Sequence, residues 1–129
     1  MIPGPVVSDT MPYAAATDLG AVREFVRARA AALGLPPPRV ELLLLAVNEL
    51  TTNTVQHTDG GGRVRVWADG QYLVCDVTDS GPMPTFGRAM PPPDATGGRG
   101  LAIVERVCDQ VRAAAVPDGT LISLRLHLR

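Results

Sequence analysis

The segment between Pro36–Pro38 and Gly60–Gly62 most narrows what this chain can fold into. Three consecutive prolines prevent a helix until the last of them, and three consecutive glycines end any helix that follows. Between them the apolar residues of "VELLLLAV" predict one long helix from Pro38 to about His57. Its second half reads "NELTTNTVQH", where a carboxylate and several amides replace apolar side chains. This half either turns a polar face to water or holds polar groups for a ligand.

The residues before this helix predict another helix and a strand. Apolar residues at helical spacing begin after Thr17 or Asp18, either of which can cap a helix, and Gly34 offers a left-handed end. Residues 1–16 hold three prolines and short apolar runs. We predict an N-terminal extension there, or an edge strand near Val6–Met11.

The residues after the long helix predict a β-hairpin. "RVRVWA" alternates, and Asp69-Gly70 turns the chain back into "YLVCDVTD". Side chains alternate between the two faces of a strand, so one face of the second strand holds Leu73, Cys75, Val77 and Asp79. This apolar face therefore ends in a carboxylate.

The C-terminal third predicts a loop, a helix and a last hairpin. Residues 80–100 hold five prolines and five glycines with little periodicity, which is typical of a lid. After Gly100, apolar residues keep helical spacing as far as Val111. "PDG" at Pro117–Gly119 then turns into a strand. Its predicted buried side holds Ile122, Leu124, Leu126 and Leu128.

This order of elements predicts a single α+β domain over residues 1–129, built as a two-layer α/β sandwich. We expect a mixed, mostly antiparallel sheet with about three helices on one face. The net charge of -1 and the pI near 6.1 argue against a nucleic-acid partner. Without a membrane-length apolar run or a signal peptide, we expect a cytoplasmic protein with no membrane partner. Cys75 and Cys108 lack metal-site spacing, so we expect both in the core.

The absence of lysine excludes several kinds of catalytic and phosphate-binding site. All twelve basic residues are arginine, and lysine is absent. A P-loop, a Schiff-base enzyme and the strand lysine of ordinary protein kinases are therefore excluded. Any phosphate must be held by backbone, arginine or metal.

Three places carry polar groups that can serve a ligand, and each also has a simpler interpretation. Glu49 and Asn53 lie about 40° apart on a helix, so they suit metal-bound phosphate or simply a solvated face. Asp79 can accept an amino group such as that of adenine, or it can cap a turn. Gly98 and Gly100 open a helix whose N–H groups attract anions, although glycines are frequent at loop ends.

Taken together, these motifs resemble a known superfamily. "NELTTN" on a helix, "DVTDSGP" at a strand end and "GGRGL" opening a later helix are similar, in that order, to the N, G1 and G2 boxes of the GHKL (histidine kinase-like ATPase) superfamily. The resemblance extends from about Thr17 to Leu128. It is closest to the stand-alone anti-sigma-factor serine/threonine kinases, because "AVREFVRARAAALGL" directly precedes "LLLAVNELTTN". It implies the Bergerat-type ATP-binding fold.

The resemblance also implies roles for particular residues, with ATP and Mg²⁺ as cofactors. Asn53 is the implied Mg²⁺ ligand, and Glu49 the implied catalytic residue, which activates the attacking hydroxyl or water. Asp79 is implied to bind the adenine amino group with Gly81 close to the base. Phosphate contacts are implied for Gly98, Arg99 and Gly100, and the lid for residues 80–100.

The activity that the resemblance implies is transfer of the terminal phosphate of ATP to serine or threonine of an anti-anti-sigma-like partner. Sequestration of a sigma factor, regulation of transcription and a homodimer are implied with it. Two positions depart from the family pattern, since Met83 replaces the last G1 glycine and Thr96 replaces a phosphate-binding arginine. The alternative is a non-catalytic module whose bound ATP or ADP sets its affinity for a partner.

Overall fold

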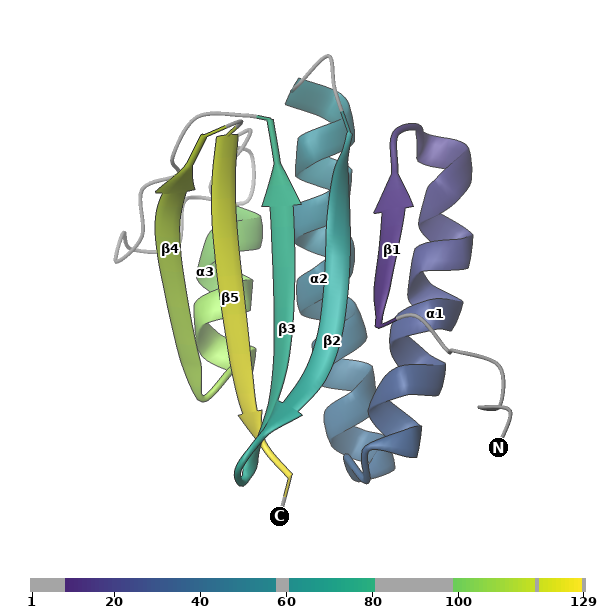
Figure 1. Ribbon diagram of the computed structural model, residues 1–129, viewed down its shortest axis with the longest axis vertical. Coiled ribbons are helices and arrows are strands. Elements are labelled where there is room, and N and C mark those ends of the chain that lie inside the picture. The colour runs from purple at the N-terminus through teal and green to yellow at the C-terminus, as the bar shows by residue number, and fades with distance from the viewer. Residues whose placement is uncertain (1–8, 58–60, 81–98, 118, 129) are drawn as a thin grey trace, which may run out of the picture.

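The protein is an open sheet with its helices on one face. The computed structural model describes residues 9–57, 61–80, 99–117 and 119–128. Strands of the sheet follow the order β1-β2-β3-β5-β4, and every pair among the described residues is antiparallel. The strands are β1 (Thr10–Tyr13), β2 (Gly62–Asp69), β3 (Tyr72–Asp79), β4 (Gln110–Val116) and β5 (Gly119–His127) (Figure 1).

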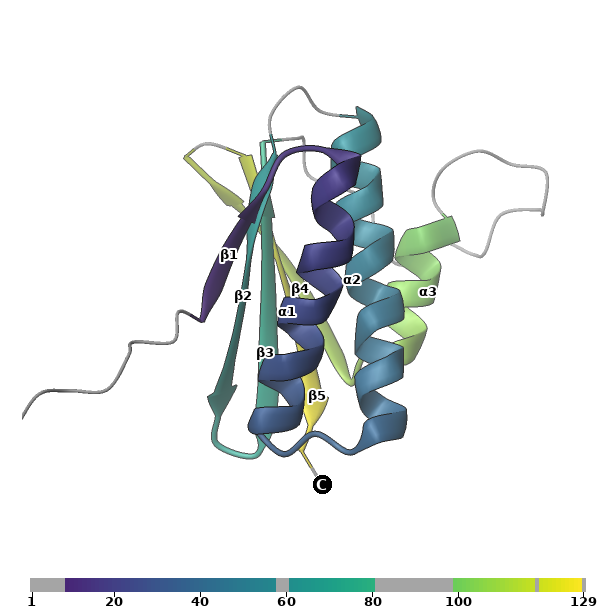
Figure 2. The ribbon, with the colours of Figure 1, turned by 90° about the vertical axis from the view of Figure 1, so that its right-hand side faces the viewer.

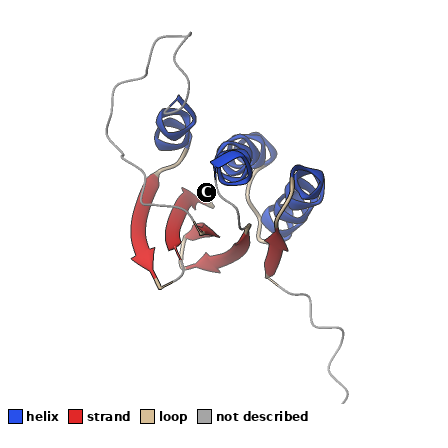
Figure 3. Ribbon diagram, turned by 90° about the horizontal axis from the view of Figure 1, so that it is seen from above, coloured by secondary structure: helices blue, strands red, loops and turns tan. Residues whose placement is uncertain are grey.

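The helices form the second layer. They are α1 (Leu19–Ala32), α2 (Pro37–His57) and α3 (Arg99–Val107), and a 3₁₀ turn at Ala16–Asp18 precedes α1. Figures 2 and 3 show all three on the same side of the sheet, with α2 in the middle. The predicted two-layer α/β sandwich is therefore confirmed. In the part of the chain that the structure describes, no helix combines the length and the apolar character that a membrane span requires.

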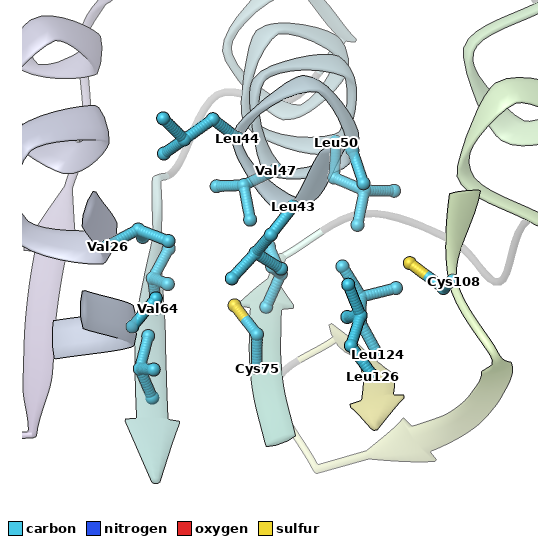
Figure 4. Close-up of a cluster of buried hydrophobic side chains, with 14 of the residues drawn as sticks. Val26, Leu43, Leu44, Val47, Leu50, Val64, Cys75, Cys108, Leu124 and Leu126 are labelled. Carbon is cyan, nitrogen blue, oxygen red and sulfur yellow. The ribbon is translucent and has the colours of Figure 1, made fainter. Parts of the chain in front are cut away.

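The long helix α2 lies where its apolar residues predict it. Its buried side chains meet those of β3 and β5 in the middle of the sandwich, with Leu43, Val47 and Leu124 at the centre (Figure 4). α1 packs beside α2 and ends at Ala32. Gly34 follows just beyond this end, and its φ of 97° suits a residue without a side chain. The Asp18 carboxylate does not cap α1 as predicted, because it accepts the N–H groups of Ala14 and Ala15 instead.

The hairpin β2–β3 also follows the prediction. Gly70 turns the chain with φ 61°, and Leu73, Cys75 and Val77 are fully buried beneath the helices. Both cysteines are free and buried, and burial raises the pKa of the Cys108 thiol to about 12. The cysteines are thus core residues, as expected.

Two more details of the predicted elements differ in the structure. Val111 lies in β4 rather than in the helix, because α3 ends at Val107 and the Asp109 N–H already bonds the Arg125 carbonyl of β5. Helical and strand spacing share positions such as Val107 and Val111, so the pattern alone did not locate this end. The first strand runs over Thr10–Tyr13, later than predicted, and residues 1–8 lie outside the described ones.

The last strand buries the predicted side. Ile122, Leu124 and Leu126 are at most 3% exposed. Leu128 follows the end of β5 and packs against the core while only partly buried.

Candidate functional site

Side chains fix α2 against the sheet near both of its ends. In its first turns, the Arg39 guanidinium forms an ion pair with Asp109 at 3.1 Å and donates to the His127 carbonyl. Near its other end, the Thr54 hydroxyl lies 3.2 Å from Oδ2 of Asp79, the last residue of β3. The polar half of α2 is therefore held beside the end of β3.

The two polar residues that the sequence singled out on α2 point away from the sheet. Arg39 reaches Asp109, which follows the end of α3, so Arg39 marks the flank of α2 nearer to α3. Asn53 lies about four helical turns after Arg39 and therefore on the same flank. Asn53 is exposed, while Glu49, one turn earlier on this flank, is half-buried. The first turn of α3 lies alongside the C-terminal half of α2 (Figures 1 and 2). Glu49 and Asn53 therefore lie on the flank of α2 that is nearer to α3.

The neighbouring amide of Asn48 has another task. Its Oδ1 accepts a hydrogen bond of 3.1 Å from Arg23 of α1, on the opposite flank of α2. Asn48 therefore links the two helices and lies outside the candidate site.

Asp79 belongs to a row of residues that runs across four strands on the helix-covered face. Tyr13 pairs with Gly62, Gly62 with Asp79, and Asp79 with Thr120. Tyr13 and Thr120 are 3% and 1% exposed, so polar groups lie buried on both sides of the carboxylate. The buried side chains at this end of the sheet are therefore polar, whereas those further along the helix-covered face are apolar.

Glycine allows the close approach of strands around Asp79. A Cβ at Gly119 would collide with the Asp79 carbonyl, and φ of 153° at Gly119 also disfavours other residues. The first residue of β5 is therefore packed directly onto the residue that the sequence predicts to bind the base.

Two threonines of this site were missed at the level of the sequence. Thr54 follows Asn53 immediately, and its hydroxyl donates a hydrogen bond to Asp79. Thr120 lies opposite Asp79 only because β5 inserts between β3 and β4 in the sheet. In the sequence, Thr120 follows a "DG" turn and alternates with the apolar residues Ile122 and Leu124, which predicts a buried position. Its pairing with Asp79 could not be predicted without the order of the strands.

The remaining predicted site residues are only partly described. Arg99 and Gly100 form the beginning of α3, so the predicted helix start is present at these two residues. Gly81, Met83, Thr96 and Gly98 lie outside the described residues, as does most of the predicted lid. The structure therefore joins α2 to Asp79 through Thr54, the residue after Asn53, and places the start of α3 beside α2.

A hollow of about 690 Å³ lies on the other, helix-free face of the sheet. Arg63, Arg65, Asp76 and Thr78 line it, and burial raises the pKa of the Asp76 carboxyl. Glu49 and Asn53 lie on the opposite side of the sheet, so this hollow is separate from the candidate site. The Asp79 side chain follows Leu73, Cys75 and Val77 onto the helix-covered face, although Asp79 also borders the hollow's rim.

The fold is similar to that of solved histidine kinases. A blue-light activated histidine kinase of Erythrobacter litoralis matches 85% of this chain with a TM-score of 0.57 at 19% sequence identity, and this chain spans 42% of its length. The histidine kinase domain of the same protein matches 96% of this chain with a TM-score of 0.56 at 17% identity, and this chain spans 66% of it. At these identities the likeness shows the fold alone.

The sequence itself identifies the family. No significant match was found among curated proteins. The sequence model of the histidine kinase-like ATPase domain, however, matches residues 13–126, which begin in β1 and end in β5. The match includes the row around Asp79, the polar half of α2 and the beginning of α3. The chain therefore belongs to the histidine kinase-like ATPase domain family, within the GHKL superfamily.

Proposed function

We propose that this protein is an ATP·Mg²⁺-binding regulatory kinase of the anti-sigma-factor type, which phosphorylates serine or threonine of a protein partner. ATP binding accords with the family, and the finer activity is our inference. The observation that carries it is the hydrogen bond between Thr54 and Asp79. This bond ties the helix with Glu49 and Asn53 to the strand end with the purine-binding carboxylate, so one ligand can span both.

The proposed binding site divides the nucleotide among three elements. Asp79 accepts the adenine amino group, with Gly81 next to the base. Backbone groups of Gly98 and Gly100, together with Arg99, hold phosphates, as suits the positive end of a helix dipole. Residues 80–100 close over the nucleotide as a lid.

The protein groups near Asn53 fit a magnesium ion that is bound mainly through the nucleotide. Among the described residues, no three histidine, cysteine or acidic side chains form a metal-binding cluster. Mg²⁺ is commonly held by one or two protein oxygens and completes its shell with phosphates and water. The exposed Asn53 amide offers one such oxygen, and the bound ion would neutralise phosphate charge.

Glu49 is the proposed catalytic residue. Its carboxylate takes the proton of the partner hydroxyl, whose oxygen forms a bond to the terminal phosphorus. The bond from this phosphorus to the bridging oxygen breaks, and ADP leaves. Positioning supplies most of the rate in such a transfer, so a docked partner is part of the site.

We further propose a cytoplasmic protein that forms a homodimer, phosphorylates an anti-anti-sigma-like substrate and sequesters a sigma factor. The alternative is a module without transferase activity, in which exchange of ATP for ADP changes partner affinity. Met83 and Thr96 favour this alternative, because they replace a glycine and an arginine of the family pattern. Release of a partner on nucleotide exchange, without any phosphorylated product, would select the alternative.

Replacing Asn53 by alanine is expected to remove the Mg²⁺-dependent part of ATP affinity. The dissociation constant for ATP with Mg²⁺ should rise about tenfold or more, the loss of roughly 1.4 kcal/mol. Titration calorimetry with Mg²⁺ and with EDTA measures the affinity for ATP with and without the metal ion.

The matched control is Asn48→Ala, which removes the amide that faces α1. This control should bind ATP·Mg²⁺ as the wild type does. Equal ATP affinity of Asn53→Ala and wild type in Mg²⁺ would contradict the assigned metal ligand.

A further inference from the structure

Tyr13 places a buried hydroxyl beside the proposed purine site from the far edge of the sheet. It is the last residue of β1, and Gly62 of β2 lies between it and Asp79 in the row across the strands. A Cβ at Gly62 would come within 2.9 Å of the Tyr13 hydroxyl. The tyrosine ring therefore reaches across Gly62, and its hydroxyl arrives near Asp79 because Gly62 has no side chain.

The surroundings of this hydroxyl are polar but leave it without a well-formed hydrogen bond. Tyr13 is 3% exposed, and its oxygen has no hydrogen-bond partner of good geometry among the described residues. Its polar neighbours are the Thr54 hydroxyl and, further off, the Asp79 carboxylate. Burial raises the Tyr13 pKa to about 12, so the hydroxyl keeps its proton at neutral pH and can donate it.

Thr54 has one proton and two acceptors within reach. Its hydroxyl lies 3.0 Å from the Leu50 carbonyl and 3.2 Å from Oδ2 of Asp79, and a single O–H serves one acceptor well at a time. A small rotation of Tyr13 that let it donate to the Thr54 oxygen would favour the arrangement in which Thr54 donates to Asp79, since hydrogen bonds in a chain polarise one another. Donation to Oδ2 fixes the rotation of the carboxylate and hence the direction in which Oδ1 can accept.

We propose that Tyr13 and Thr54 are positioning residues that orient the Asp79 carboxylate toward the amino group of a 6-aminopurine and thereby set preference over 6-oxopurines. The inference rests on the proposed nucleotide site and adds its base specificity. A carboxylate accepts from the amino group of adenine, whereas the 6-oxo group of hypoxanthine presents another acceptor. The orientation of Asp79 should therefore affect the affinity for ATP and hardly change the affinity for inosine triphosphate.

The test compares ATP and inosine triphosphate by titration calorimetry in Mg²⁺. Tyr13→Phe removes only the hydroxyl and should weaken ATP binding by about 3–10-fold, with inosine triphosphate binding nearly unchanged. Thr54→Val should reduce the preference at least as much. Because the two hydroxyls act in series, the double variant should lose no more preference than Thr54→Val.

Tyr72→Phe is the matched control, because its ring lies on the helix-free face and packs against His127 at 4.4 Å. It should keep the wild-type preference. Thermal unfolding of each variant establishes that it is folded.

The outcomes separate this inference from the proposed function. A wild-type protein that binds no ATP overturns both. A wild type that binds ATP, with Tyr13→Phe weakening both nucleotides equally or neither, overturns only the role of Tyr13, because a structural role would affect both nucleotides alike.

Discussion

Replacing Glu49 by alanine is expected to lower phosphoryl transfer from ATP by about 10²–10⁴-fold, the usual contribution of a general base. Binding of ATP·Mg²⁺ should stay close to that of the wild type, because Asn53 and Asp79 remain. Glu49 lies one turn before Asn53 on the flank of α2 nearer to α3 and is half-buried, so its carboxylate can face a hydroxyl near the terminal phosphate. The measurement follows the label of terminally labelled ATP into inorganic phosphate and into a bound protein substrate.

The matched control for Glu49 is Glu41→Ala. Glu41 is an exposed carboxylate on the same helix, and it forms an ion pair with Arg27 of α1. Its loss should leave transfer unchanged. Transfer at the wild-type rate by Glu49→Ala would remove this residue from the mechanism, and absence of transfer by the wild type would favour the non-catalytic module.

Replacing Leu43 by alanine should lower the free energy of unfolding by about 2–5 kcal/mol. Leu43 is fully buried between α2 and the sheet, so its removal leaves a cavity in the centre of the single core (Figure 4). For a chain of this size the expected fall in melting temperature is on the order of 10 °C. Urea unfolding followed by circular dichroism measures it.

The adjacent residue gives a control within the same helix. Leu42 is 41% exposed, so Leu42→Ala should change stability by about 0.5 kcal/mol or less. Similar losses for both variants would mean that α2 does not face the sheet as described.

The core elements of this fold were predictable because each carries its own pattern. α2 lies between prolines and glycines, and the Gly70 turn joins two alternating strands. Prediction failed where one residue fits both helical and strand spacing, and where an element is very short. Val111 satisfied helical and strand spacing alike, and the ladder with β5 decided for a strand. The four-residue β1 was predicted too early, because its pairing with β2 fixes it rather than its own composition.

The candidate site was predictable in its parts but not in its contacts. Glu49, Asn53 and Asp79 were found from helix spacing, strand alternation and motif order. Contacts between distant segments depend on the strand order and on how α2 lies over the sheet, and local pattern does not determine either. Thr54, Thr120 and Tyr13 were therefore overlooked as neighbours of Asp79, although two of them lie beside predicted turns or site residues.

The most direct test of this account is binding of ATP·Mg²⁺ to the intact chain, followed by thermal unfolding and calorimetry with Asp79→Asn in parallel. ATP at 100-fold its dissociation constant should stabilise the wild type by about 2.7 kcal/mol. Asp79→Asn should bind about tenfold more weakly or worse, because the amide no longer offers two acceptor oxygens to the base. No stabilisation of the wild type, or equal affinity of the two proteins, would contradict a nucleotide site between α2 and the end of β3.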